Sequence, residues 1–182
     1  MNYATIKNCD IANGPGVRVS LFVSGCTHRC SGCFNEVAWD FEYGEEFTPE
    51  IENKILKMLE PDYIRGLTLL GGEPFEPRNQ GPIVEFLRKV KAQYPDKSIW
   101  AYSGYLFEKD LLSGRLGMAD TTMEFLRFLD VLVDGPFVEG KKNLSLRFRG
   151  SENQRLIDVQ SSLSAGETVL WQDWQGERNG KK

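Results

Sequence analysis

Two kinds of hydrophobic pattern take turns along this chain. Apolar and polar residues alternate in VRVSLFV, residues 17–23, which predicts a strand because successive side chains of a strand face opposite ways. Short apolar runs at residues 66–70, 98–102 and 131–133 predict three further strands. Residues 144–150 and 155–160 are weaker candidates for short strands.

Segments with helical spacing lie between these strands. Residues 47–60 place apolar side chains on one face, and Thr48 and Pro49 suit the N-cap and the first helical position. Helices are also expected at about residues 82–92 and within 121–129. Alternating strands and helices predict βαβ units, a parallel sheet and an α/β fold.

Length and composition fit one globular domain. The chain has 182 residues, 41% of them hydrophobic, and we expect a domain at residues 1–165 followed by a polar, flexible tail at 166–182. The net charge of −4 and the lack of a long basic run argue against nucleic-acid binding. No apolar run approaches the roughly 20 residues that span a bilayer, so we expect a cytoplasmic protein without membrane contact. Thiols stay reduced there, and clustered cysteines then indicate metal or redox chemistry.

Cys26, Cys30 and Cys33 occur together in SGCTHRCSGCFN. A structural zinc site needs four ligands, and the candidates for a fourth are Cys9 and His28, although ligation by His28 would strain so short a loop. Thiol exchange by Cys30 and Cys33 is a second interpretation. An iron–sulfur cluster is the third and the favoured one. Three thiolates would leave one iron open for a substrate or cofactor.

Four unusual loops each follow a predicted strand directly: the cysteine loop, GGEP at residues 71–74, SGY at 103–105 and DGPF at 134–137. In a parallel sheet such loops share the carboxyl edge, where ligands bind in barrels and open sheets alike. The sequence therefore predicts that the four loops form one site.

The segment NGPGVRVSLFVSGCTHRCSGCFN, with GGEP after the next strand, resembles the radical S-adenosylmethionine enzymes. More narrowly it is similar to the family that activates anaerobic ribonucleoside-triphosphate reductase, as are VLVDGPF and RGSENQR; the resemblance covers roughly residues 8–160. It implies a partial (β/α) barrel with a mostly parallel sheet. It also implies a [4Fe-4S] cluster, S-adenosylmethionine, a low-potential electron donor, and a 5'-deoxyadenosyl radical that takes hydrogen from a glycine of the reductase.

The resemblance also implies residue roles. Cys26, Cys30 and Cys33 would hold the cluster. The expected cofactor contacts are Gly32, Cys33, Phe34, Gly71, Gly72, Glu73, Ser103 and Asp134. The wider superfamily often has an aromatic residue just before the third cysteine; here that position is Gly32, and Phe34 follows instead.

Several residues keep alternative interpretations. Phe34 suits core packing, and Ser103 and Asp134 suit turns. We expect His28 to bond within its loop or face solvent, and Cys9 to be a small buried residue. Arg147 and Arg149 suit a solvated face or a partner contact. A radical enzyme for a small substrate and a non-catalytic metal-binding or electron-carrying module remain alternative functions.

Overall fold

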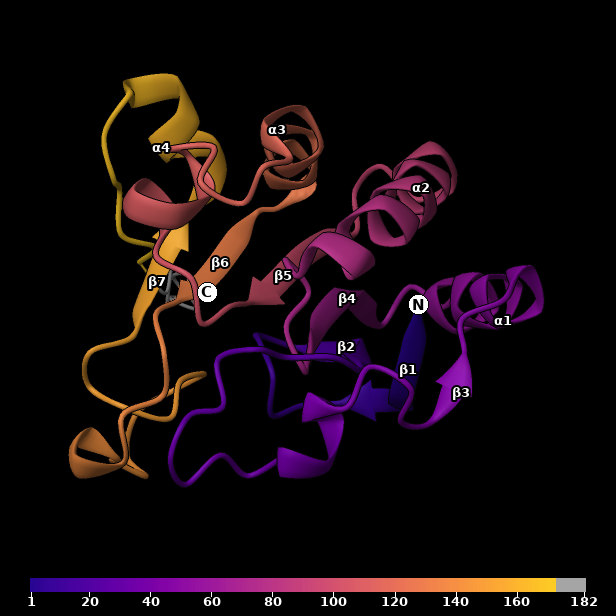
Figure 1. Cartoon of the computed structure of the whole chain (residues 1–182). Coiled ribbons are helices and arrows are strands. Elements are labelled where there is room, and N and C mark those ends of the chain that lie inside the picture. The colour runs from indigo at the N-terminus through magenta and orange to yellow at the C-terminus, as the bar shows by residue number, and fades with distance from the viewer. Residues whose placement is uncertain (173–182) are drawn as a thin grey trace, which may run out of the picture.

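The computed structural model describes residues 1–172, which form one mixed sheet of seven strands (Figure 1). The strands, in chain order, are β1 (Asn2–Asp10), β2 (Val17–Val23), β3 (Glu45–Glu46), β4 (Ile64–Gly71), β5 (Ser98–Tyr102), β6 (Val131–Asp134) and β7 (Arg155–Asp158). Their order across the sheet is β3-β1-β2-β4-β5-β6-β7.

The strand directions confirm an α/β fold and correct one part of the prediction. The central strands β2, β4, β5 and β6 run parallel to one another. Strands β1 and β3 on one side, and β7 on the other, pair antiparallel. The sheet is therefore mixed and not mostly parallel. β3 and β7 are the two edge strands and do not pair with each other, so the sheet is open. An open sheet does not by itself confirm the predicted partial barrel.

Four α-helices lie on one face of the sheet (Figure 1). They are α1 (Pro49–Leu59), α2 (Pro77–Gln93), α3 (Ala119–Phe128) and α4 (Val159–Ala165). Alternate strand residues such as Leu21, Leu69 and Ile99 meet these helices in the main core. Trp100 and Val133 point to the other face, which loops cover. Side chains of a strand alternate between the two faces of the sheet. One face therefore packs against the helices in the core, and the other face is available for a binding site.

The predicted strands at residues 17–23 and 98–102 have the bounds that the sequence indicated. The strand β1 was missed because NYATIKNCD has few apolar residues and an irregular burial pattern. Helix α2 begins at Pro77, five residues before the predicted start, and includes Pro82. Residues 144–150 are turns and bends, so the strand proposed there is wrong.

The C-terminal segment packs on the loop-covered face as far as it is described. The ring of Trp171 lies 5.0 Å from that of Trp100 and 6.5 Å from that of Phe148. Residues 173–182, most of the predicted flexible tail, lie outside the described residues. Within residues 1–172 the longest helices fall short of the length and apolarity that crossing a membrane requires.

Candidate metal and cofactor site

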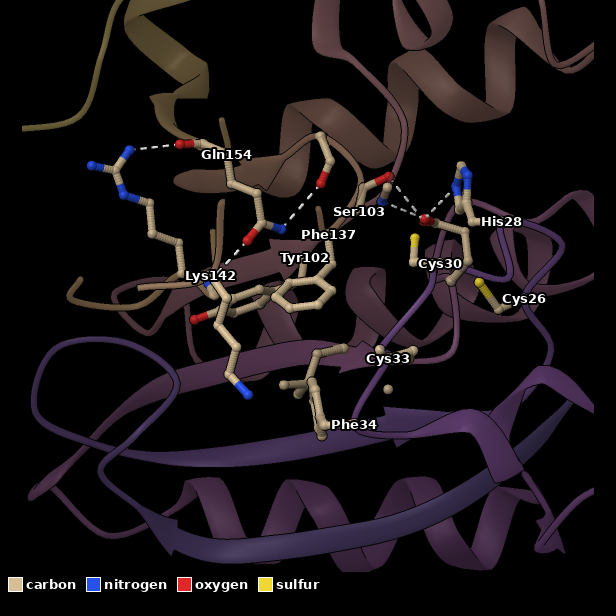
Figure 2. A pocket seen from close by; sticks show the side chains of 18 of the residues that line it. Cys26, His28, Cys30, Cys33, Phe34, Tyr102, Ser103, Phe137, Lys142 and Gln154 are labelled. Atoms are coloured by element: carbon tan, nitrogen blue, oxygen red, sulfur yellow. Dashed lines mark hydrogen bonds and ion pairs between the residues drawn. The ribbon is translucent and has the colours of Figure 1, made fainter. Parts of the chain in front are cut away.

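The loops that follow β2, β4, β5 and β6 enclose one cavity of about 530 Å³ (Figure 2). Its lining includes all three clustered cysteines and most of the predicted cofactor contacts: Cys26, Cys30, Gly32, Cys33, Phe34, Gly71, Gly72, Glu73 and Ser103. The volume falls within the range of small-molecule sites. The structure thus brings the four loops together at the edge where the sequence placed them.

The cysteine loop is held to the sheet edge by a short 3₁₀ helix, η1 (Glu36–Trp39). The Gly25 amide donates to the Ala38 carbonyl at 2.8 Å, and the Cys26 amide donates to the Trp39 carbonyl at 3.2 Å. Gly25 has φ +92°, and a Cβ there would lie 2.2 Å from the ring of Phe41. Only glycine allows this crossing of the two chain segments.

The thiols of Cys26 and Cys30 are half-buried, and their pKa values are raised. Burial, helped by the carboxylate of Glu73, raises the pKa of Cys26 to about 12. Burial also raises the pKa of Cys30. Deprotonating these thiols is unfavourable unless positive charge offsets the cost, and bound iron supplies such charge.

The donor set fits a cluster better than a single ion. In residues 1–172, no three side chains among His, Cys, Asp and Glu converge closely enough to hold one metal ion. An iron–sulfur cube presents a separate iron to each thiolate, so its ligands need not converge on one point. Of the two candidates for a fourth zinc ligand, His28 lines the cavity but is bonded to Glu73, and Cys9 is exposed and outside the lining. We expected Cys9 to be a small buried residue, and its exposure shows that this prediction is wrong.

GGEP packs directly against the cysteine loop. A Cβ on Gly72 would lie 2.5 Å from the Gly25 carbonyl oxygen and 3.0 Å from that of Ala38. The Gly72 amide donates to the Val23 carbonyl at 2.7 Å, and the Glu73 amide donates to the Gly25 carbonyl at 2.8 Å. Gly72 is therefore required for contact between two loops of the protein, besides lining the cavity.

Glu73 joins three loops through its carboxylate. Its side chain is 1% exposed. One oxygen accepts from the Phe75 amide at 2.9 Å and from Ser103 Oγ at 3.0 Å. The other accepts from the Gly104 amide at 2.7 Å and lies 3.1 Å from His28 Nε2 (Figure 2). Satisfied on both oxygens, this buried carboxylate stabilises the relative positions of the loops after β2, β4 and β5.

His28 bonds to the loop after β4 through Glu73, and not within its own loop. Its ring packs edge-on against Tyr105, with centroids 4.3 Å apart. A Cβ on Gly104 would come within 2.6 Å of the same ring. Burial lowers the pKa of His28, but the hydrogen bond to Glu73 and nearby carboxylates outweigh it and raise the pKa overall.

Asp134 and Phe34 differ in how they relate to the cavity. Asp134 is buried and outside the lining; its carboxylate accepts from the Phe107 amide at 2.9 Å and from Arg155 Nε at 2.9 Å. These contacts favour a structural role over contact with a ribose. Phe34 lines the cavity and is 85% exposed, so the alternative of core packing is wrong.

Several site residues escaped sequence reasoning. Glu76 accepts from both the amide and the hydroxyl of Thr27, at 2.8 and 2.5 Å, and so ties the cysteine loop to α2. Tyr102 lines the cavity with a buried hydroxyl that has no hydrogen-bond partner in the described part of the chain. In the sequence, only the position of Tyr102 at the end of a predicted strand, next to Ser103, could have indicated that it belongs to the site.

Comparisons with known proteins agree with this chemistry. A family model described as a 4Fe-4S single cluster domain matches residues 12–157. The chain is 42% identical over 158 residues to the anaerobic ribonucleoside-triphosphate reductase-activating protein of Enterobacteria phage T4, covering 86% of this chain and 93% of that protein. Proteins of the same name from Vibrio cholerae and Escherichia coli K12 are 40% and 38% identical over 156 residues, 85% of this chain and 96% of each relative.

Proposed function

Because this chain belongs to the family of anaerobic ribonucleoside-triphosphate reductase-activating proteins, we propose that it generates a glycyl radical on such a reductase. The single observation that carries the proposal is the convergence of three cysteines, GGEP and the loop after β5 on one cavity. The mixed sheet, with its cavity on the face opposite the helices, supports a partial barrel of the radical S-adenosylmethionine type.

The cofactors would supply the radical chemistry. A cluster held by Cys26, Cys30 and Cys33 would supply one-electron reductive cleavage of S-adenosylmethionine, and the cleaved cofactor would supply the oxidant that removes a hydrogen atom from the glycine. A low-potential electron donor would have to reduce the cluster again after each cleavage of S-adenosylmethionine. The rest of the task, which is placement and exclusion of water, belongs to the protein.

The cysteine loop would hold the cluster. Cys26, Cys30 and Cys33 each offer one thiolate, while the lining's remaining histidine and carboxylate, His28 and Glu73, are bonded to each other. The free iron would then be available to the amino and carboxylate groups of S-adenosylmethionine. All three cysteines are half-buried, which limits the access of water to a cluster held there.

GGEP and the loop after β5 would orient the cofactor. The carboxylate of Glu73 is occupied by donors from three loops, so the backbone carbonyls of Gly71 and Gly72 are the better acceptors for the cofactor's ammonium group. Gly32, Phe34 and Ser103 line the same cavity and would contact the nucleoside. Glu73 and His28 act by positioning these loops.

The proposal is tested by reconstituting the protein with iron and sulfide under anoxia, reducing it and adding S-adenosylmethionine. We expect a full iron complement, 5'-deoxyadenosine as product, and a glycyl radical signal in electron paramagnetic resonance when reductase is added. Cys30→Ala should lose iron and all activity. Cys9→Ser is the matched control, because Cys9 is exposed and outside the cavity, and it should behave as the parent does.

Other results would contradict the proposal. Zinc in place of iron in protein purified without oxygen would indicate a structural metal site. A full cluster that yields no 5'-deoxyadenosine with a strong reductant would indicate an electron carrier. Formation of 5'-deoxyadenosine without a radical on the reductase would indicate a small substrate.

A further inference from the structure

A basic segment borders the cavity on the side of the loop after β6. Residues 138–150, which we name the basic strap, contain four cationic side chains, Lys141, Lys142, Arg147 and Arg149, and one acidic side chain, Glu139. The strap therefore has a formal charge of +3, in a chain whose net charge is −4. Lys142 and Leu144 of the strap line the cavity. Figure 2 shows Lys142 on the opposite side of the cavity from His28 and Cys26.

The basic strap is held in place by contacts at both ends. Ser31 Oγ of the cysteine loop donates to Glu139 at 3.0 Å, and the Glu152 amide donates to the Lys141 carbonyl at 2.9 Å. Phe148 packs edge-on against Trp100, with ring centroids 5.5 Å apart. These contacts fix the strap as an ordered wall of the cavity.

Two large apolar side chains nevertheless project from this wall and from the cysteine loop. Leu144 is 90% exposed and Phe34 is 85% exposed, and both line the same cavity. Exposed apolar side chains that gather at a binding site, bordered by charge, indicate contact with a macromolecule. Leu144 lies in a turn and buries little of its surface against the described residues.

We propose that the basic strap, with Leu144 at its centre, is the docking surface for the reductase and receives an acidic and apolar segment beside the radical-accepting glycine. This inference rests on the proposed function, which requires a glycine of the partner to enter this cavity. The positive strap would attract carboxylates of the entering segment and speed encounter, and Leu144 would be buried on contact. The occupant is a chain segment of the reductase, because an exposed leucine between cationic side chains at the border of the cavity suits an apolar and acidic polypeptide.

The test measures binding of full-length, reconstituted protein to reductase under anoxia, by calorimetry and without S-adenosylmethionine. Leu144→Ser should weaken the complex about tenfold, the effect of losing one buried apolar anchor. Lys141→Glu should weaken the complex and make its affinity less dependent on salt. Tyr63→Ser is the matched control: Tyr63 is 60% exposed but precedes β4, at the opposite edge of the sheet, and its loss should leave binding unchanged.

A second measurement separates docking from chemistry. Formation of 5'-deoxyadenosine without reductase should be the same for Lys141→Glu as for the parent, because Lys141 lies outside the lining of the cavity. If the parent binds reductase but makes no 5'-deoxyadenosine, the proposed function fails and the docking result still stands. Parental affinity of Leu144→Ser for reductase would overturn the inference. Weaker binding of the electron donor alone would overturn it as well.

Discussion

Replacing Glu73 by glutamine is the sharpest test of how the site is assembled. Glutamine has the shape of glutamate, but one acceptor oxygen becomes an NH2 group and the negative charge is lost. Each carboxylate oxygen of Glu73 faces two partners: Phe75 and Ser103 on one side, Gly104 and His28 on the other. In either orientation of the amide, therefore, two contacts lose their acceptor.

The expected cost follows from these contacts. A buried hydrogen bond to a charged group contributes about 1.5–3 kcal/mol, so losing two should lower the free energy of unfolding by roughly 3 kcal/mol. That is a large part of the about 5–15 kcal/mol that stabilises a typical domain. For a chain of this size the melting temperature should fall by about 6–12 °C.

The assay is thermal unfolding at neutral pH, followed by far-ultraviolet circular dichroism and repeated under anoxia with the cluster reconstituted. Glu124→Gln is the matched control, because Glu124 forms an exposed ion pair with Arg88 at 2.7 Å. An exposed pair contributes about 0–1 kcal/mol, so this control should melt near the parent. If Glu73→Gln also melts with the parent, Glu73 does not hold the three loops together and the argument for its positioning role is wrong.

Two further predictions concern the backbone and the pH dependence of stability. Gly72→Ala should prevent iron incorporation, because its Cβ would meet the Gly25 carbonyl at 2.5 Å. Gly81→Ala in α2 is the control: a Cβ there meets nothing within 4 Å, so this variant should be neutral or more stable by about 0.5–1 kcal/mol. Iron analysis and melting temperatures of both variants check this, and normal iron in Gly72→Ala would refute it. The hydrogen bond from Arg155 holds the pKa of Glu108 at about 2, below its ordinary 4.5. This pair should therefore stabilise the protein fully above about pH 4.5, and its contribution to stability should be lost as the pH falls toward 2. Urea unfolding across that range should show a shallower pH dependence for Glu108→Gln, and identical slopes would contradict the prediction.

Strand and helix positions were predictable where the pattern of side chains is local. Residues 17–23 and 98–102 are apolar enough to be read as strands without knowing their neighbours. Strand β1 was not, because its stability comes from pairing with β2 and β3 and not from its own apolar residues. The antiparallel direction of β7 likewise depends on where the chain turns after residue 134.

The spacing of Cys26, Cys30 and Cys33 determined the chemistry of the site, since the order of donors along a short loop is a local property. Folding alone decided which distant groups meet around them. His28 and Glu73 are 45 residues apart in the chain, and Ser31 and Glu139 are 108 apart. No local pattern encodes such contacts, because they depend on the sheet order that brings separate loops to one edge. The sequence therefore determined which thiols are available to a metal centre. The tertiary structure decided which buried carboxylate lies beside their loop and which exposed leucine lines the cavity.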